Sequence, residues 1–192
     1  RFPIKKKEIL FVGRLVIEKG VHLYVDAIKD IAVKYPEWSF GLIGSFRLGD
    51  NKHRNFYSDE IIKKMKAIGP QAQFYGFKEQ EFVEEKMKNA SIIVIPSIWE
   101  EPFGLVAAEG MSNGACIVAS KVGGIPEIIK DNGILIDNIN LENLSSEMDN
   151  LITDNKLRKS FQRKAWENFE LSSETSSQRL DHFRQFISSK YF

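Results

Sequence analysis

Short apolar runs alternate with amphipathic stretches along the first 140 residues, and most of the runs end at a glycine or a proline. A short continuous apolar run is typical of a strand that is buried on both faces of a sheet. Six strands are expected, at residues 8–12, 38–43, 72–75, 92–95, 115–119 and 134–136. Strands that alternate with helices form a parallel sheet with right-handed crossovers. The sequence therefore predicts a Rossmann-like, doubly wound α/β fold: a six-stranded parallel sheet with helices on both faces.

The amphipathic stretches predict the helices. One helix is expected over residues 21–35, and another begins with a cap at Ser58. A helix of small apolar residues is expected over 104–113, although Gly110 weakens it by about 1 kcal/mol relative to alanine. Extra C-terminal helices are expected beyond Asn140, because neither Pro nor Gly occurs in that part of the chain.

Composition narrows the class of protein. The chain has 192 residues, of which 43% are hydrophobic and 28% charged, as in an ordinary globular domain. Its formal net charge of +1 gives no global reason to expect a nucleic acid partner. A single cysteine, Cys116, excludes an internal disulfide framework and a multi-cysteine zinc site. No apolar run is long enough to span a membrane, and no signal peptide is visible. Because the first residue is Arg1 and not Met, we expect a piece of a longer protein.

Ligands of such a fold bind at the carboxyl ends of the strands, so the loops that follow the strands are the candidate sites. The first loop, residues 13–20, has neither the G-x-G-x-x-G fingerprint of dinucleotide-binding folds nor the sequence of a P-loop. It contains two cations instead, Arg14 and Lys19. Arg binds a phosphate in a fork, and Lys binds it as a point charge. The pair is either solvated at the surface or binds an anion, and its position after a strand favours the anion.

The second candidate loop, residues 96–104, leads directly into the helix of small apolar residues. The N–H groups of Phe103, Gly104 and Leu105 should lack partners within the helix, and a helix N-terminus of this kind binds anions. Gly104 is expected to leave room for a ligand beside the backbone. This loop therefore predicts a second group of anion contacts at the same edge of the sheet.

Two glutamates flank the start of this helix, Glu101 before it and Glu109 inside it. At a rise of about 1.5 Å per residue, they are too far apart to share a proton as an adjacent dyad. They could hold two separate hydroxyl-bearing parts of one ligand. Glu101 is also explained as a complement to the helix dipole, whereas Glu109, among small apolar residues, needs a partner if it is buried.

Two further loops add candidates. Gly123 and Gly124 give either a close backbone approach or a plain turn. Arg47, which follows the second expected strand, adds a third cation. We therefore expect Arg14, Lys19 and Arg47 to form a local cluster of positive charge at one edge of the sheet.

Three segments, in this order and spacing, resemble a known family. They read Gly-Arg-Leu-x-x-x-Lys-Gly at 13–20, Pro-Ser-x-Trp-Glu-Glu-Pro-Phe-Gly-Leu-Val at 96–106 and Gly-Gly-Ile-Pro-Glu at 123–127. Together they resemble the nucleotide-sugar-binding C-terminal domain of the retaining GT-B glycosyltransferases of group 1. That family includes bacterial lipopolysaccharide and capsule hexosyltransferases, and Glu101 and Glu109 match its paired-glutamate motif.

The resemblance implies a role for each matching residue. Arg14 and Lys19 would bind the donor diphosphate, and Glu101 would hold sugar hydroxyls; these three are the catalytic candidates. Glu109 would hold the ribose hydroxyls. The main chain of Gly76, Phe77 and Lys78 would contact the base. The backbone amides of Phe103, Gly104 and Leu105 would contact the sugar and the phosphates. No Asp-x-Asp occurs in the chain, so a metal-dependent GT-A site is not indicated, and no metal or cofactor is expected.

The resemblance also implies a larger enzyme. Residues 1–192 would be the donor-binding domain, inactive alone, and the family's acceptor-binding N-terminal domain is absent from this chain. The donor would be a nucleoside-diphosphate sugar, with UDP-hexose favoured. The acceptor would be a glycan or a lipid-linked saccharide of lipopolysaccharide or polysaccharide biosynthesis. The enzyme would be cytoplasmic, and a peripheral association with the inner face of the membrane is one expectation.

Two alternatives stay open. One is a non-catalytic nucleotide-sugar-binding module, and the other is half of a nucleotide-sugar 2-epimerase, which also has two such domains. The sequence departs from the family pattern at residues 44–47, which read Gly-Ser-Phe-Arg instead of Gly-Asp-Gly, and at Gly110. These departures leave the identity of the donor open and do not affect the expected fold.

Overall fold

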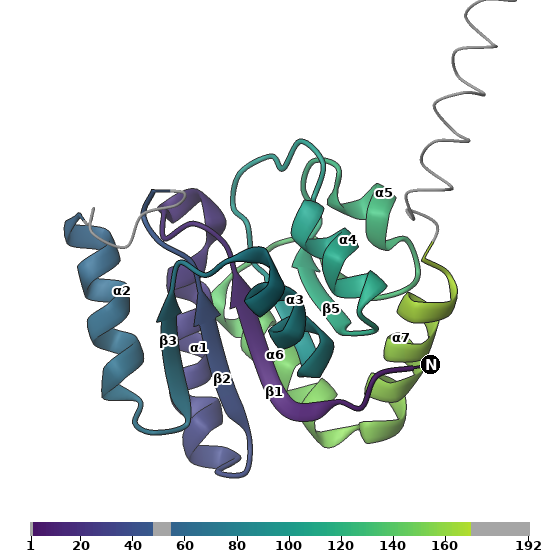
Figure 1. Cartoon of the computed structure of the whole chain (residues 1–192), viewed down its shortest axis with the longest axis horizontal. Coiled ribbons are helices and arrows are strands. Elements are labelled where there is room, and N and C mark those ends of the chain that lie inside the picture. The colour runs from purple at the N-terminus through teal and green to yellow at the C-terminus, as the bar shows by residue number, and fades with distance from the viewer. Residues whose placement is uncertain (1, 48–54, 170–192) are drawn as a thin grey trace, which may run out of the picture.

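The computed structural model describes residues 2–47 and 55–169. Six parallel strands form one sheet in the order β3-β2-β1-β4-β5-β6 (Figure 1). The strands are β1 (Lys6–Val12), β2 (Ser39–Ile43), β3 (Ala72–Gly76), β4 (Ala90–Ile95), β5 (Cys116–Ser120) and β6 (Ile134–Ile136). The order is that of a Rossmann-like fold. It confirms the fold class predicted from the sequence.

Helices cover both faces of the sheet (Figure 1). One face carries α1 (Val21–Lys34), α2 (Phe56–Ala67) and α6 (Leu141–Thr153), and the other carries α3 (Gln80–Asn89), α4 (Leu105–Ser112) and α5 (Ile125–Ile129). The last described helix, α7 (Asn155–Glu167), packs against both cores. The expected C-terminal helices are therefore present up to residue 167, and the remainder of that expectation, residues 170–192, lies outside the described residues. None of the helices in the described ranges is long and apolar enough to cross a bilayer.

Consecutive residues of the central strands enter different cores. Ile9 of β1 belongs to the core beneath α1, α2 and α6, whereas Leu10 belongs to the core beneath α3, α4 and α5. Ile92 and Ile93 of β4 divide in the same way. Because helices cover both faces, every position of β4 and residues 8–11 of β1 are buried, and such strands appear in the sequence as largely apolar runs.

The cap of α2 is Asn55 and not Ser58, so this detail of the sequence prediction is wrong. The Ser58 N–H donates to Asn55 Oδ1 at 2.8 Å, and the Asn55 N–H donates to Ser58 Oγ at 2.9 Å. This reciprocal pair is a capping box with Ser58 at its third helical position. Asn and Ser are both favourable caps, so residue type alone does not say which of two candidates three residues apart begins the helix.

Gly110 allows α4 to lie close to the sheet. A Cβ at this position would lie 2.7 Å from Ile117 Cδ1 of β5 and 3.0 Å from Ile93 Cδ1 of β4. Gly110 therefore lowers the helix propensity of α4 but lets the helix pack close to the sheet. The Cβ of an alanine at this position would hinder that packing.

Lys5, in the segment before β1, holds the ends of two helices. Its ammonium donates to the carbonyl oxygens of Met87 at 3.2 Å, Lys88 at 3.0 Å and Asn113 at 2.7 Å. These carbonyls belong to the C-terminal ends of α3 and α4, where unpaired carbonyls and the helix dipole favour a cation. Lys5 thereby fastens the amino end of β1 to the helices on one face of the sheet.

Candidate functional site

The two central strands of the sheet are connected in opposite directions. From β1 the chain continues to β2 on one side, and from β4 it continues to β5 on the other. The crevice at the carboxyl ends of such a strand pair is the usual ligand position of open α/β sheets. The loops that follow β1 and β4 are residues 13–20 and 96–104, which are the first two candidate loops, and they lie along the upper edge of the molecule in Figure 1.

These two loops pack directly against each other. The Ile98 N–H donates to the carbonyl oxygen of Glu18 at 2.9 Å. A Cβ on Gly20 would overlap the carbonyl oxygen of Pro96. The main chains of the two loops therefore approach as closely as a glycine permits, and they form one continuous wall of the crevice.

Within this wall, Lys19 and Glu101 form an ion pair between Lys19 Nζ and Glu101 Oε1. The same carboxylate oxygen accepts a 2.7 Å hydrogen bond from Ser97 Oγ. The Glu101 side chain is only 15% exposed. The sequence assigned Lys19 to a phosphate and Glu101 to a sugar, and the structure brings the two side chains together as each other's partners.

Two hollows meet at this ion pair, because Lys19 and Glu101 line both of them. The larger has a volume of about 350 Å³, and its lining residues are Arg14, Glu18, Lys19, Trp99, Glu100, Glu101 and Pro102. The smaller has a volume of about 100 Å³ and extends beneath the start of α4, where Ser97, Gly104 and Leu105 line it. The side chains of Lys19 and Glu101 thus form a shared wall that separates the two hollows.

The charge around the larger hollow is mixed. Arg14 and Lys19 line it together with three carboxylates, those of Glu18, Glu100 and Glu101. Of the expected cluster of cations, Arg14 and Lys19 therefore lie together at this hollow, but the carboxylates offset their charge. The sequence predicted Glu101 at the site, but it did not predict that Glu18 and Glu100 would face the same space. Across the described ranges, no three His, Cys, Asp or Glu side chains gather in a way that could hold a metal ion.

Arg14 is exposed and is held in place by its neighbour. Leu15 is 1% exposed, and its N–H donates to the carbonyl oxygen of Ser45 at 2.9 Å. This anchoring leaves the guanidinium of Arg14 at the rim of the larger hollow, with no partner among the residues that the structure describes. Arg47 is exposed, and its carbonyl accepts a hydrogen bond from Ser45 Oγ. Arg47 lines neither hollow.

The start of α4 offers free donors, as the sequence predicted. Its N-cap, Gly104, provides no side-chain cap, and no described group accepts from the N–H groups of Phe103, Gly104 or Leu105. The reason for the glycine differs from the expected one. Gly104 has a φ of 83°, and a Cβ there would lie 3.1 Å from Ile125 Cγ1. The position therefore requires glycine for its left-handed backbone, whether or not a ligand approaches it.

The third loop supports the second. The Gly124 N–H donates to the carbonyl oxygen of Glu101 at 2.7 Å. Gly123 has a φ of 54°, and a Cβ there would overlap the backbone of Glu101. The close backbone approach predicted for this Gly-Gly pair is thus an approach to the protein's own main chain. It holds the main chain of Glu101, whereas Lys19 of the first loop pairs with its side chain.

Glu109 lies half-buried on α4 beside the start of α3. Its carboxylate accepts a 3.4 Å hydrogen bond from Gln80 Nε2. Burial raises the pKa of Glu109; the Gln80 hydrogen bond lowers it, and the charge of Glu84 raises it further. Glu109 therefore has the partner that its burial requires, and its carboxylate lies next to the turn that follows β3.

The turn after β3 contains the three residues expected at a base. Gly76 is buried, and its carbonyl oxygen accepts from the Gly44 N–H at 2.9 Å. Phe77 is half-buried, and Lys78 is exposed with its ammonium 5.1 Å from the ring centroid of Phe82. A Cβ on Gly44 would overlap the carbonyl oxygen of Gly13, so the turns after β1, β2 and β3 are packed together.

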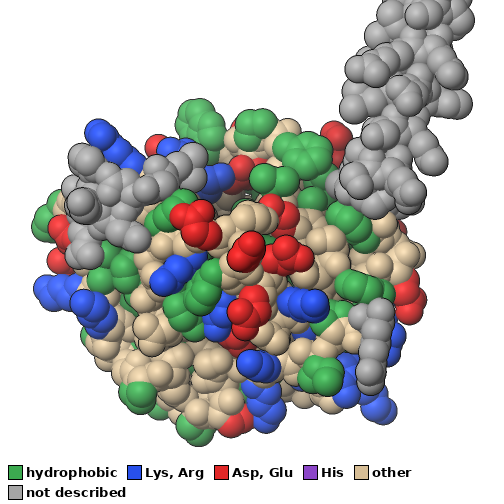
Figure 2. Space-filling model, viewed as in Figure 1, with side chains coloured by type: hydrophobic (Ala, Val, Ile, Leu, Met, Phe, Trp, Pro, Cys, Tyr) green, Lys and Arg blue, Asp and Glu red, His purple; other side chains and the backbone are tan. Residues whose placement is uncertain are grey.

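Three residues near these loops were not singled out from the sequence. Ser97 orients Glu101, Gln80 contacts Glu109, and Trp99 lines the larger hollow with its side chain 69% exposed. Trp99 carries a sequence signal, because a large aromatic residue in a polar loop is unusual unless it contacts something. Figure 2 shows other hydrophobic side chains gathered over the same upper edge.

Comparison with known proteins identifies one family. The model of the family described as glycosyl transferases group 1 matches residues 1–167. An uncharacterized glycosyltransferase from Methanocaldococcus jannaschii is 37% identical over 152 residues, which are 78% of this chain and 39% of that protein. The chain therefore spans less than half the length of this relative.

Two solved structures show the same fold. HepE from Anabaena, in complex with UDP-glucose, superposes with a TM-score of 0.78 at 21% identity, over 95% of this chain and 49% of that one. The C-terminal domain of LpcC, a group 1 family protein from Francisella tularensis, superposes with a TM-score of 0.69 at 27% identity. That match covers 85% of both chains, so the described fold corresponds to a domain that has been solved on its own.

Proposed function

Since the chain belongs to the glycosyl transferases of group 1, we propose that it is the donor-binding C-terminal domain of a retaining hexosyltransferase. The match to a separate C-terminal domain along 85% of both chains supports this assignment. The acceptor-binding domain would belong to the longer protein. The donor we propose is a nucleoside-diphosphate sugar, with UDP-hexose favoured, as in the UDP-glucose complex of HepE.

The single observation that carries the proposal is the shared wall formed by Lys19 and Glu101 at the centre of the sheet's carboxyl edge. One hollow beside this wall contains the free guanidinium of Arg14, and the other reaches the free amides at the start of α4. A ligand with a diphosphate attached to a hydroxylated ring matches this arrangement. The phosphates would contact Arg14, Lys19 and the α4 amides, and the ring hydroxyls would contact Glu101.

The remaining contacts extend the donor along the sheet edge. Glu109 would accept hydrogen bonds from the ribose hydroxyls. Its neighbour Gln80 follows the turn at residues 76–78, whose main chain would meet the base. These assignments account for why a half-buried carboxylate lies in an otherwise small and apolar helix.

The chemistry follows from where charge develops. Transfer breaks the bond between the anomeric carbon and the diphosphate oxygen, and the leaving diphosphate keeps the electron pair. The same carbon would bond, with retention, to a hydroxyl oxygen of the acceptor, whose proton would pass to the leaving diphosphate. The growing charge of the diphosphate would be stabilised by Arg14, Lys19 and the N-terminus of α4, which are fixed donors next to the leaving group. We propose that no metal takes part, since the chain has no Asp-x-Asp and Arg14 and Lys19 can themselves stabilise the charge of the leaving diphosphate.

Donor binding would require an exchange of partners. Lys19 and Glu101 neutralise each other as an ion pair. A nucleotide-sugar donor would offer phosphate oxygens to Lys19 and hydroxyl groups to Glu101. Each of the two side chains would then contact the ligand in place of the other side chain. Ser97, which lies in the same loop as Glu101, would keep its hydrogen bond to Glu101 during this exchange.

Calorimetry tests the proposal directly. The 192-residue chain is titrated with UDP, GDP and ADP in buffer that contains a chelator, after circular dichroism has established that it is folded. Saturable binding of UDP without metal is expected. A folded sample that binds none of the three nucleotides would contradict the proposed function.

A further inference from the structure

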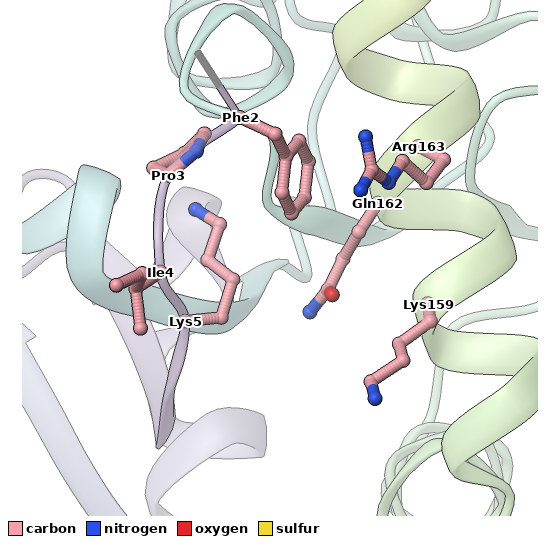
Figure 3. Close-up of a pocket in the computed structure, with 7 residues that line it drawn as sticks. All are labelled: Phe2, Pro3, Ile4, Lys5, Lys159, Gln162 and Arg163. Atoms are coloured by element: carbon pink, nitrogen blue, oxygen red, sulfur yellow. The ribbon is translucent and has the colours of Figure 1, made fainter.

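A second pocket lies at the opposite edge of the sheet, where the segment that enters β1 faces α7. Its volume is about 550 Å³, and its lining residues are Phe2, Pro3, Ile4, Lys5, Lys159, Gln162 and Arg163. Figure 3 shows the segment of residues 2–5 on one side and α7 on the other, with the side chains of Phe2 and Lys5 and those of the α7 residues directed into the space between them. No role proposed for the donor site involves any of these residues.

The charge of this pocket has one sign. Three of its seven lining residues are cationic, Lys5, Lys159 and Arg163, and none is acidic. The donor site differs, because three carboxylates share its larger hollow with two cations. A concave surface with cationic walls of this kind attracts an anion.

The guanidinium of Arg163 is held in position. It lies 4.4 Å from the ring centroid of Phe2, and that ring in turn packs edge-on against Trp166 at 6.0 Å. Stacking on an aromatic face restrains the guanidinium plane and leaves its N–H groups at the edge available. In the part of the chain that is described, no carboxylate pairs with Arg163. Figure 3 shows the guanidinium beside the Phe2 ring at one end of the pocket.

Gln162 supplies a fixed polar group. Its residue is 3% exposed, and its Nε2 donates to the carbonyl oxygen of Ser91 at 2.9 Å. The amide lies at the tip of a side chain that extends into the pocket from α7 (Figure 3). Because the Ser91 bond uses one amide hydrogen, the second can donate to a ligand.

Lys5 contributes positive charge to the pocket but has no N–H left to donate to a ligand. Its three hydrogen bonds go to backbone carbonyls, so the ammonium is fixed at the pocket wall. Burial lowers the pKa of Lys5 to about 7, because its positive charge is poorly solvated there, so near neutral pH it carries only part of a charge. An anion in the pocket would stabilise that charge.

We propose that this pocket binds a phosphate group, with Arg163, Lys159 and Gln162 as its polar contacts. Arg forms the forked bonds that suit phosphate oxygens, and Lys adds a point charge at the open rim. The volume exceeds that of a phosphate alone, and Phe2 and Pro3 offer an apolar wall to the organic part of a phosphate ester. Such a phosphate could belong to a soluble ester or to a lipid headgroup, and the proposal stands apart from the function of the donor site.

The probe is inorganic pyrophosphate, titrated into ¹⁵N-labelled chain and followed by two-dimensional NMR. Saturable shifts are expected in the side-chain amide of Gln162 and in the backbone amides of Phe2, Ile4, Lys5 and residues 159–163. Pyrophosphate is also expected to shift residues 13–20 through the donor site, so the two sites are read separately in one spectrum. The same spectra establish that each variant is folded.

Matched double variants of α7 test the assignment. Lys159→Gln with Arg163→Gln removes both free cations of the pocket and should weaken pyrophosphate binding there at least about tenfold. Lys156→Gln with Lys164→Gln removes two exposed charges from the same helix outside the pocket, and should change the affinity less than about threefold. Equal weakening by both variants, or no saturable shifts at residues 159–163, would overturn the proposal.

Vesicles distinguish the two sources of phosphate. Cosedimentation with phosphatidylglycerol vesicles, but not with phosphatidylcholine vesicles, that is lost in the Lys159→Gln/Arg163→Gln variant would assign the pocket to a lipid headgroup. Pyrophosphate binding without cosedimentation would assign it to a soluble phosphate ester.

Discussion

The N–H of Gly124 donates a 2.7 Å hydrogen bond to the carbonyl oxygen of Glu101. This bond joins the loop after β5 to the loop after β4, and it fixes the main chain of the glutamate whose side chain pairs with Lys19. Gly123 lies against the backbone of Glu101 and has a φ of 54°. Neither this conformation nor the space beside Glu101 accommodates a Cβ. The position of Glu101 therefore depends on a loop that lies more than twenty residues further along the chain.

Substitution of Gly123 by alanine should displace Glu101. The new Cβ would overlap the Glu101 backbone, so either the third loop or the second must move. We expect a loss of stability above the roughly 1–2 kcal/mol that positive φ alone costs an alanine, together with weakened UDP-glucose binding. Urea unfolding and calorimetry measure the two effects.

Gly69→Ala is the matched control for this change. Gly69 also has a positive φ, of 108°, but a Cβ there would meet no atom within 4 Å. It should lose stability through backbone strain alone and keep its affinity for UDP-glucose. If both variants bind UDP-glucose equally well, Gly123 does not position the site.

Removal of both proposed phosphate cations should weaken nucleotide binding. Arg14→Ala with Lys19→Ala eliminates two charge-assisted contacts, and we expect UDP to lose several kcal/mol of binding free energy at most. Lys63→Ala with Lys66→Ala removes two exposed charges from α2 and serves as the control. Unchanged UDP affinity in the first variant would refute the phosphate assignment.

Glu101→Gln should separate the binding of UDP from that of UDP-glucose. The carboxylate competes with phosphate for Lys19, so its loss should leave UDP affinity unchanged or raise it up to about fivefold. The sugar should at the same time lose its acceptor, so the ratio of UDP-glucose to UDP affinity should fall. Calorimetry with both ligands gives this ratio. Asp137→Asn is the control, because Asp137 belongs to an exposed pair with Lys121 elsewhere on the carboxyl edge.

The raised pKa of Glu109 predicts a pH dependence of binding. Burial places its folded-state pKa above the ordinary value of about 4.3. Ribose hydroxyls would donate to the carboxylate, so UDP affinity should fall as pH decreases through that raised pKa. Glu109→Gln should lack this step, whereas Glu142→Gln, on the exposed side of α6, should retain it.

The same pKa fixes the sign of a stability effect. Between the unfolded and the folded pKa of Glu109, the folded chain binds more protons, so the free energy of unfolding should decrease as pH rises through that interval. Glu109→Gln should flatten this part of the stability curve. A curve that is identical for the wild-type chain and the variant would show that Glu109 has an ordinary pKa.

Gly110→Ala tests the close approach of α4. The alanine gains helix propensity, but its Cβ would press on Ile117 Cδ1, and overpacking of this kind costs about 1–3 kcal/mol. Ile117→Val removes that Cδ1 atom and alone should cost about 0.5–1.5 kcal/mol. In urea unfolding, the double variant should lose less than the sum of the two single losses.

The fold was predictable because its signals are local. Ile92 and Ile93 face opposite cores, so their strand has to be apolar throughout and is visible as a run in the sequence. The alternation of strands and helices predicted a parallel sheet and thus its carboxyl edge, and with it the loops that contain Arg14, Lys19 and Glu101. Gly104 was correctly placed at a helix start, since a break before a helix is also a local feature.

The arrangement within the site depends on contacts between distant segments, and these left no local signal. Glu18 and Glu100 are ordinary polar loop residues until the loops meet, so the mixed charge of the larger hollow was missed. Gln80 became the partner of Glu109 only through the packing of α3 beside α4. The pairing of Lys19 with Glu101 also arises only where the loops after β1 and β4 meet, whereas the family resemblance assigns the two side chains to different parts of the donor.

Three close main-chain approaches, at Gly20 against Pro96, Gly44 against Gly13 and Gly123 against Glu101, join the loops of the carboxyl edge. None of these approaches depends on the identity of a side chain that faces the hollows. Donor preference can therefore be changed by exchanging those side chains one for one, whereas an insertion or a deletion in any of these loops would shift its neighbours as well. In directed evolution of such a domain, libraries of fixed loop length should yield active variants far more often than libraries in which loop length varies.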